Sequence, residues 1–457
     1  MAALTASWTE VEGAVAKAAT AGLEDLVGAL RIPSISAHGD GLQQSAEYLE
    51  HLLARDGWSV EVVEIDGNPI VFAEVGPAGA PAILLYGHHD VQPVDPEAAW
   101  VTPPFEPTIR DGSIYARGSA DNKGQFFCHL LAARALARQP GGLPVRLKLV
   151  LDGQEEVGSP QLPAFIERLR PRLEGARLCL TADGPTRIER RPEVVYGVRG
   201  SVMLRLTVRT SETDLHSGNW GNLAPSAAWR LAQLLAALKG LDGRVTVPGF
   251  YDEAVPPTDA ERAALAAIPF SAEEALASIG GSFLDGPPEV PALQRLMFLP
   301  TLTVTGIQGG YTGPGFKTVI PSTATALIDV RLVVDQDPTR MFELLRDHLA
   351  QIAPDSTLER LSHYLPSRTA FDEPVAAHVL AAVKRGFGRP PLRVPCMGGS
   401  LPDGAFATLL GVPVLRVPYG APDQRNHAPN EHMRLDHLHM GTRTSAALFL
   451  GVGGARP

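Results

Sequence analysis

A polar segment that directly follows an apolar run carries the residue types of a metal site. The run at 82–86 is continuously apolar, as expected of a strand covered on both faces, and residues 87–92 read Gly-His-His-Asp-Val-Gln. On an extended chain His88 and Asp90 point to the same side, so one can bind a metal ion while the other orients it. Alone, the pair is also compatible with ordinary polar residues at a strand end.

Further acidic and imidazole side chains follow at other predicted strand ends and loops, namely Asp121, Glu155, Glu156, Asp183 and His427. Two divalent cations about 3.5 to 4 Å apart require a carboxylate that bridges them, terminal His and carboxylate ligands, and a water that they acidify. The chain contains every member of this ligand set. The sequence therefore predicts a site for two metal ions.

Asp121 is the natural bridge between the two ions. It follows the strand-and-turn segment 115–119 and precedes Gly124, where the chain turns into a predicted helix. The alternative role for this side chain is that of an N-cap, which would satisfy backbone N–H groups at the start of the same helix.

Adjacent carboxylates at Glu155 and Glu156 follow the apolar strand predicted at 145–151. They repel one another unless a cation lies nearby, and in such a pair one side chain binds metal while its neighbour takes a proton from water. A solvated loop is the alternative interpretation of this pair. For His427, which lies in a loop, the alternative is a hydrogen-bonded surface residue.

The elements that must position these residues alternate between helices and strands. The pattern of apolar residues predicts helices at 8–30, 42–57, 124–139 and 162–169, and strands at 60–63, 70–75, 82–86, 145–151 and 176–180. This alternation predicts an α/β sandwich in which ligands lie at the carboxyl ends of the strands.

The pattern changes near residue 199, where a separate α+β unit is predicted to begin. Its expected elements are strands at 201–209, 301–307 and 324–333 and helices at 225–238 and 338–352, with an insertion of short helices at 248–300. The α/β pattern returns with helices at 374–386 and 435–450 and a strand at 412–417. We therefore predict a first domain made of residues 1–198 and 369–457, interrupted by a second domain at 199–368.

Composition narrows the class of protein. The chain has 457 residues, of which 45% are hydrophobic and 20% charged, as in globular enzymes with more than one domain. A net charge of -10 without a Lys/Arg run argues against binding to nucleic acid. Three cysteines without a CxxC pair, and no apolar run of about 18 residues, lead us to expect a cytoplasmic protein that does not enter a membrane.

Taken together, these motifs resemble the dinuclear metallopeptidase family that contains carnosinase, aminoacylase, glutamate carboxypeptidase and succinyl-diaminopimelate desuccinylase. The likeness covers nearly the whole chain and is closest to the dipeptidase branch with carnosinase and cytosolic non-specific dipeptidase. It implies a phosphorylase/hydrolase-like α/β sandwich as the catalytic domain. It also implies an inserted ferredoxin-like lid and dimerisation domain, and hence a homodimer.

The resemblance assigns a role to each candidate residue of the metal site. It makes Asp121 the bridge, followed by a cis peptide bond, and Glu155 the general base. His88 and Asp183 would bind one metal ion, while Asp90 supports His88. Glu156 and His427 would bind the other ion. His89 is expected to turn away from the metals because neighbouring residues of a strand face opposite sides.

Residues of the second domain and of the glycine turn at 397–400 match segments that contact substrate in this family. His216, in the segment 214–218, would donate to the oxyanion from the partner subunit, and Arg331 would pair with the terminal carboxylate of the substrate. Gly399 and Ser400 would line the substrate pocket. Without the resemblance, His216 and Arg331 would be interpreted as surface residues and the glycine turn as a simple change of chain direction.

The function implied is metal-dependent hydrolysis of an amide bond in dipeptides or short peptides with a free C-terminal carboxylate. Two ions, Zn²⁺ first and Mn²⁺ or Co²⁺ as alternatives, would activate a bridging hydroxide for attack. An N-acyl amino acid deacylase of the acetylornithine or succinyl-diaminopimelate type is the alternative, although Asp183 replaces the Glu common among deacylases. A non-catalytic binding protein on the same fold is a second alternative.

Overall fold

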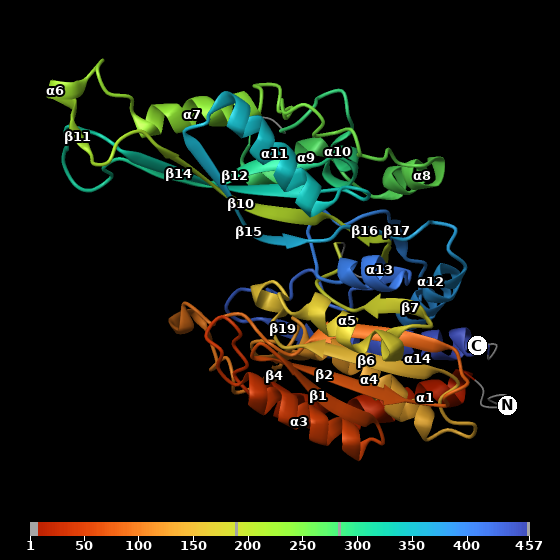
Figure 1. The fold of residues 1–457 in the computed structure, drawn as a ribbon. Coiled ribbons are helices and arrows are strands. Elements are labelled where there is room, and N and C mark those ends of the chain that lie inside the picture. The colour runs from red at the N-terminus through yellow and green to blue at the C-terminus, as the bar shows by residue number, and fades with distance from the viewer. Residues whose placement is uncertain (1–7, 188–190, 282–284, 455–457) are drawn as a thin grey trace. The chain divides into compact units, whose positions relative to one another are not determined.

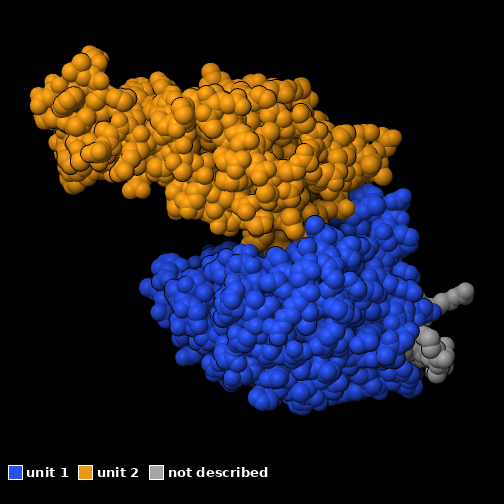
Figure 2. Space-filling view, in the orientation of Figure 1, with its two compact units in different colours: residues 1–197, 369–394, 405–457 blue, residues 198–368, 395–404 orange. Residues whose placement is uncertain are grey.

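The computed structural model describes residues 8–187, 191–281 and 285–454, and its chain divides into two compact units. Figure 2 distinguishes unit 1, which comprises residues 1–197, 369–394 and 405–457, from unit 2, which comprises 198–368 and 395–404. The sequence-based boundaries assign 395–404 to the interrupted first domain. The segment groups with unit 2 because its backbone carbonyls and Ser400 accept hydrogen bonds from residues of that unit.

Unit 1 is built on a mixed eight-stranded sheet, so the predicted α/β class is confirmed. Across the sheet the strands are β1 (Ser59–Ile65), β2 (Asn68–Val75), β6 (Arg146–Asp152), β3 (Ala82–His88), β7 (Ala176–Thr181), β18 (Val414–Arg416), β8 (Glu193–Val195) and β17 (Leu392–Val394). β3 is parallel to both β6 and β7, and β18 is parallel to β7. The carboxyl ends of these strands therefore share one edge of the sheet.

Helices cover both faces of this sheet (Figure 1). One layer contains α1 (Trp8–Ala21), α2 (Leu23–Leu30), α3 (Leu42–Arg55), α4 (Lys123–Ala137), α12 (Pro374–Phe387) and α14 (Leu435–Val452), and the other contains α5 (Leu162–Leu173) and α13 (Gly404–Leu410). β2 and β6 are buried on both sides over most of their length, because both helix layers contact them.

The single helix predicted at 8–30 is two helices that meet at Gly22. A Cβ atom at this position would lie 2.1 Å from Leu131 Cδ2, so glycine lets the chain pass close to this side chain of α4.

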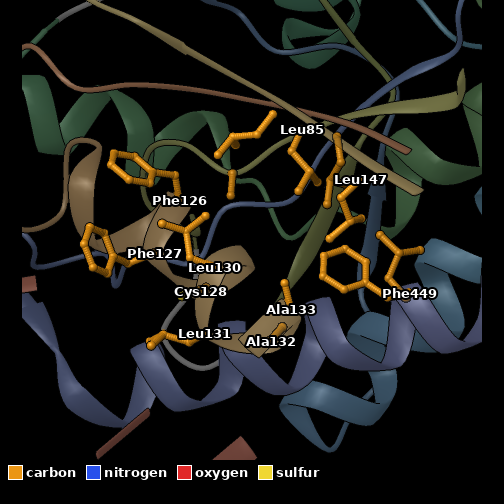
Figure 3. Packing of buried hydrophobic residues seen from close by; sticks show 14 of the residues in the cluster. Leu85, Phe126, Phe127, Cys128, Leu130, Leu131, Ala132, Ala133, Leu147 and Phe449 are labelled. Carbon is orange, nitrogen blue, oxygen red and sulfur yellow. The ribbon is translucent and has the colours of Figure 1, made fainter. Parts of the chain in front are cut away.

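Helix α4 lies in the middle of its layer, where it contacts the sheet, α1 and α14. Figure 3 shows Phe126 and Leu130 of this helix near Leu85 and Leu147 of the sheet, with Phe449 of α14 close by. Nearly every residue of α4 is buried, so the helix has no polar face. Its start is therefore a rigid support for the residues that precede it.

A small three-stranded sheet was not predicted from the sequence. It consists of β4 (Thr108–Arg110), β5 (Ser113–Tyr115) and β19 (His432–Arg434), with β5 in the centre. The antiparallel pairing of His432 with Tyr115 brings the C-terminal part of the chain beside the segment that leads to Asp121. Two short 3-10 turns, η1 (Glu97–Ala99) and η2 (Glu155–Val157), complete the elements of unit 1.

Unit 2 contains a four-stranded antiparallel sheet with helices α7 (Ala227–Leu238) and α11 (Pro338–Ile352) packed on it. The strand order is β12 (Thr301–Gly309), β14 (Thr323–Leu332), β10 (Gly200–Arg209) and β15 (Ser356–Tyr364). Along the chain these elements follow the order β-α-β-β-α-β, the split βαβ arrangement.

The remaining elements are short. The insertion at 248–300 contains α8 (Asp259–Ala267), α9 (Ala272–Ile279) and α10 (Ala292–Phe298), while residues 282–284 of the predicted insertion lie outside the described residues. β11 (Leu215–His216), which continues into α6 (Ser217–Trp220), pairs with β13 (Val319–Ile320), and β9 (Gly197–Val198) pairs with β16 (Ser367–Arg368). No helix in the described part of the chain combines the length and apolar character needed to cross a bilayer.

Candidate metal centre

The candidate ligands of unit 1 come from strand ends and from the loops that follow them. His88 is the last residue of β3, Asp183 lies two positions beyond β7, and Glu156 lies in η2 after β6. Asp121 precedes α4, and His427 lies in the loop between β18 and β19. The shared edge of the parallel strands and the β5–β19 pairing together explain how such distant positions meet.

These five residues form two clusters with one member in common. One cluster contains His88, Asp121 and Asp183 and the other contains Asp121, Glu156 and His427, and within each cluster the potential ligand atoms lie within 4.8 Å of one another. Asp121 is the shared residue. Its Oδ1 lies 3.1 Å from His88 Nε2, and its Oδ2 lies 3.0 Å from His427 Nε2. Each oxygen of this carboxylate thus faces a different cluster.

The alternative role of Asp121 as a helix N-cap is wrong. Helix α4 begins after Asn122, and no side chain caps its first turn. The peptide bond between Asp121 and Asn122 is cis, as the resemblance implies. The Asp121 carboxylate is therefore directed to the two histidines instead of to the helix.

Asp90 connects His88 to the paired glutamates. Its two carboxylate oxygens accept hydrogen bonds from the backbone N–H groups of Glu155, at 3.1 Å, and Glu156, at 3.0 Å. Its Oδ1 also lies 3.3 Å from His88 Nδ1, which leaves His88 Nε2 for the cluster. Burial raises the pKa of Asp90, but these hydrogen bonds outweigh burial and the net pKa is below its usual value.

Carboxylates dominate the electrostatics of the site. Burial raises the pKa of Glu155 well above its usual value, and the charges of Asp183, Glu156 and Asp121 raise it further. Hydrogen bonds to Asp121 and Glu156 raise the pKa of His427 to about 10. So dense a group of buried acidic oxygens favours a cation among them.

The donor set fits two divalent metal ions. Glu156 Oε1 is buried and makes no hydrogen bond, whereas Oε2 of the same carboxylate is 3.2 Å from His427 Nε2. An unsatisfied buried oxygen is costly unless an ion or a donor reaches it. Imidazole nitrogens and carboxylate oxygens are ligands that zinc, manganese and cobalt all accept.

Glu155 adjoins the clusters without belonging to either of them. Its Oε2 lies 3.8 Å from His88 Nε2, and its backbone is held by Asp90. His89, as strand alternation predicts, turns elsewhere: its Nε2 lies 2.9 Å from the carbonyl oxygen of Pro69, and burial lowers its pKa to about 4.

The candidate substrate residues belong to unit 2, where they form two local groups. His216 is exposed, and its Nε2 lies 3.3 Å from Thr318 Oγ1. In the other group Arg331 donates a hydrogen bond of 2.8 Å to Ser400 Oγ, and the carbonyl oxygen of Gly399 accepts one from the backbone of Arg199. The glycine turn is thus tied to the strand that carries Arg331.

Two polar residues that contact the ligands were not singled out from the sequence. Gln92 Nε2 donates to Glu156 Oε2 at 2.9 Å, and Asn426 Nδ2 donates to Asp121 Oδ2 at 3.4 Å. Both lie close to a candidate ligand in the sequence, Gln92 two positions after Asp90 and Asn426 directly before His427. The signal available in the sequence was their position in the motifs that contain Asp90 and His427.

Comparisons with known proteins agree with the resemblance seen in the sequence. The chain is 31% identical to the Beta-Ala-His dipeptidase of Homo sapiens over 395 residues, which cover 84% of this chain and 77% of that protein. It is 26% identical to the Cys-Gly metallodipeptidase DUG1 of Saccharomyces cerevisiae over 457 residues, with 92% and 93% covered. The crystal structure of the M20 family metallo-carboxypeptidase Sso-CP2 from Sulfolobus solfataricus matches with a TM-score of 0.87 and 32% identity, covering 94% of this chain and 99% of that chain.

The match to a family model extends over most of the chain. Residues 84–450, which contain all five candidate ligands and Glu155, match the model of Peptidase family M20/M25/M40. The predicted family and its dipeptidase branch are therefore confirmed. The chain belongs to Peptidase family M20/M25/M40.

Proposed function

We propose that this chain is a dipeptidase that uses two divalent metal ions to hydrolyse dipeptides and short peptides with a free C-terminal carboxylate. The observation that carries the proposal is the shared position of Asp121, whose two carboxylate oxygens face His88 and His427 at 3.1 Å and 3.0 Å. A carboxylate between two ligand clusters is the arrangement that a pair of ions requires. The similarity to a Beta-Ala-His dipeptidase and a Cys-Gly metallodipeptidase supports dipeptides as substrates.

His88, Asp121 and Asp183 would hold one ion, and Asp121, Glu156 and His427 the other. When bound, the ions would lower the pKa of a water molecule and polarise the carbonyl of the scissile amide. Zn²⁺ is the ion we propose, since it is common in hydrolytic sites with histidine and carboxylate ligands.

Glu155 is the general base in this proposal. Its carboxylate belongs to neither cluster but lies beside them, with Oε2 3.8 Å from His88 Nε2, where it could accept a proton from water and then deliver it to the leaving amine. Asp90 would keep it in place, because one Asp90 oxygen accepts a hydrogen bond from the backbone N–H of Glu155. The adjacent Glu156 stays with the metal because Gln92 and His427 bind its Oε2.

Substrate recognition is assigned to unit 2. Arg331 would bind the terminal carboxylate of the peptide through its planar guanidinium group, with Gly399 and Ser400 lining the same subsite. His216 would donate to the oxyanion that forms on the scissile carbonyl. Closure of the lid would bring these groups to the substrate and exclude water.

A homodimer formed through unit 2 is part of the proposal. Strand β12 is an edge strand, and large apolar side chains of unit 2 are exposed at Trp220, Leu223, Trp229, Ile307 and Leu327. Exposed apolar groups and an open sheet edge each favour association with a second copy. We also propose a cytoplasmic location, because none of the three cysteines is in a disulfide bond.

A substrate panel tests the proposed function. Zinc-loaded protein would be assayed with dipeptides, with the same dipeptides blocked as C-terminal amides, and with N-acetyl and N-succinyl amino acids. We expect dipeptides to be hydrolysed with the highest kcat/KM and the amides to be poor substrates. Preference for the acyl amino acids would instead indicate a deacylase, and absence of all hydrolysis in metal-replete protein would indicate a binding protein.

A further inference from the structure

Glu431 is a buried carboxylate near the metal ligands that has no part in the proposed chemistry. It lies directly before β19, has no solvent-exposed surface, and accepts four hydrogen bonds. Oε2 accepts from Arg117 Nη1 at 2.7 Å and from the backbone N–H of Gly118 at 3.1 Å. Oε1 accepts from the backbone N–H groups of Ala120 and Asp121, both at 2.9 Å.

Three of these four donors belong to the backbone that leads into the shared ligand. The carboxylate therefore fixes the path of residues 118–121 and directly holds the peptide N–H of Asp121. The backbone carbonyl of Glu431 adds a further contact, because it accepts a hydrogen bond from the N–H of Ala116 at 3.2 Å. These hydrogen bonds restrict the backbone conformation at Asp121 and hence the direction of its side chain.

The same residue fixes the loop of the second histidine. Glu431 lies four positions after His427. Between them, Asn430 donates to the carbonyl oxygen of Ala99 at 2.9 Å and accepts from the backbone N–H of Val101 at 2.8 Å. The adjacent residues Asn430 and Glu431 thus anchor the loop on the C-terminal side of His427.

Burying the ion pair between Glu431 and Arg117 costs desolvation free energy, which a role in stability alone does not explain. Arg117 is 1% exposed, and its Nη2 donates to the carbonyl oxygen of Pro93 at 2.8 Å. Burying such a pair removes both charges from water, and well-packed apolar residues often stabilise a fold as well or better. The ion pair is explained if the negative charge of Glu431 is needed to accept hydrogen bonds from three converging backbone N–H groups, those of Gly118, Ala120 and Asp121.

We propose that Glu431 is a positioning residue that sets Asp121 and His427 at the separation required to bind two metal ions. The inference rests on the proposed dinuclear function and adds to it a residue that belongs to neither ligand cluster. Glu431 orients Asp121 through backbone N–H groups instead of through the ligand side chain. Substitution of Glu431 is therefore expected to weaken the binding of both ions, since Asp121 belongs to both clusters.

The test is Glu431→Gln, which preserves size and shape. An amide can still accept from Ala120 and Asp121, but its NH₂ group would face the donors of Arg117 and Gly118. Metal dissociation constants would be measured without substrate, by competition with a chromophoric chelator, and the absorption spectrum of Co²⁺-loaded protein would report the ligand geometry. We expect a 10- to 100-fold loss of metal affinity, as for other residues that orient metal ligands, and an altered Co²⁺ spectrum.

Asp25→Asn is the matched control. This carboxylate also binds arginines, accepting from Arg55 at 3.0 Å and 2.8 Å and from Arg134 at 2.8 Å, but it touches no part of the ligand segments. Its substitution should lower the thermal midpoint of metal-free protein and leave metal affinity and the Co²⁺ spectrum unchanged. Equal loss of metal affinity in Asp25→Asn and Glu431→Gln would reduce Glu431 to a structural role and overturn the proposal.

The outcomes separate this inference from the proposed function. If wild-type protein fails to bind two ions per chain, the dinuclear function itself fails. If wild-type protein binds two ions and Glu431→Gln binds them equally well, only the positioning role is wrong. Should Glu431→Gln not fold, Glu431→Asp keeps the charge but shortens the side chain, and wild-type metal affinity in that variant would contradict the proposal.

Discussion

Arg331 Nη1 donates a hydrogen bond of 2.8 Å to Ser400 Oγ, across 69 positions of the chain. The same guanidinium group donates through Nε to Asp329 Oδ2 at 2.9 Å. These two contacts fix the plane of the guanidinium group, which is a requirement for recognising a carboxylate with two parallel hydrogen bonds. The pairing favours a recognition role for Arg331 over that of an ordinary surface residue.

Arg331→Lys should lower kcat/KM for dipeptides by about 10- to 100-fold, chiefly through a higher KM. Lysine keeps the positive charge but cannot present two parallel donors. Steady-state kinetics would be compared for dipeptides and for their C-terminal amides, which lack the carboxylate. A loss of the same size on both kinds of substrate would show that Arg331 does not bind the carboxylate.

Glu155→Gln should retain both metal ions but lose at least about 10²-fold in turnover, the usual scale for a general base. Glutamine has nearly the same shape and cannot accept a proton. Elemental analysis would establish the metal content, and kcat would be measured at saturating substrate. Unchanged turnover in the metal-loaded variant would refute the role of Glu155.

The variants His427→Ala and Glu156→Ala should lose a bound metal ion as well as turnover. The two side chains lie 3.2 Å apart and both belong to the cluster that Asp121 shares. After dialysis against a weak chelator, each variant is expected to retain about one ion per chain, as judged by elemental analysis. His89→Ala is the control. The His89 ring contacts the carbonyl oxygen of Pro69, so this variant should still bind two ions per chain.

His216 should act on substrate bound by the other subunit. His216→Ala and Glu155→Gln are each expected to be nearly inactive alone, because each removes a different group needed for the reaction. When the two proteins are mixed under conditions of subunit exchange, some dimers contain one intact site, and activity should partly return. Absence of recovery in a mixture that demonstrably forms heterodimers would place His216 outside the partner's site.

His129 should make the fold sensitive to acid. It is fully buried in α4, its Nδ1 lies 2.9 Å from Ser445 Oγ, and burial lowers its pKa from 6.5 to about 3. Above pH 6.5 the imidazole is neutral in both the folded and unfolded states. Between pH 6.5 and 3 only the unfolded chain binds the proton, so stability is lost as the pH falls through this window.

The measurement compares wild type with His129→Gln in metal-free protein, so that release of metal does not contribute. Urea unfolding at pH 7.5, 6 and 5 gives the free energy of unfolding for each. The difference between the two proteins should change by about 2 kcal/mol between pH 7.5 and 5, in favour of the variant. A constant difference across this range would contradict the assigned pKa.

The ligands of unit 1 could be predicted because each lies where a strand ends or in a distinctive loop motif. His88 follows an apolar run, and the repulsion within the Glu155–Glu156 pair indicates a cation. The role of Asp121 needed the structure, since a carboxylate before a helix is equally typical of an N-cap. In the structure no side chain caps α4 and the Asp121 carboxylate contacts His88 and His427, which excludes the N-cap role.

Elements that lack a strong apolar pattern were missed. β15 lies at an edge of its sheet and exposes most of its residues, so its sequence shows little of the alternation that marks a half-buried strand. The three-residue strands β5 and β19 are too short to be recognised, and their pairing joins Tyr115 to His432. Such long-range pairing depends on the whole fold, which explains why Glu431 was not singled out.

The β5–β19 pairing also bears on how the protein is made. During synthesis, the nascent chain completes β3, β6 and β7 long before it reaches β19. Until then β5 has only β4 beside it, and the loop that carries His427 does not yet exist. A chain released before this point would hold the ligands of the first cluster but could not complete the second, so premature termination is expected to yield protein that captures at most one ion.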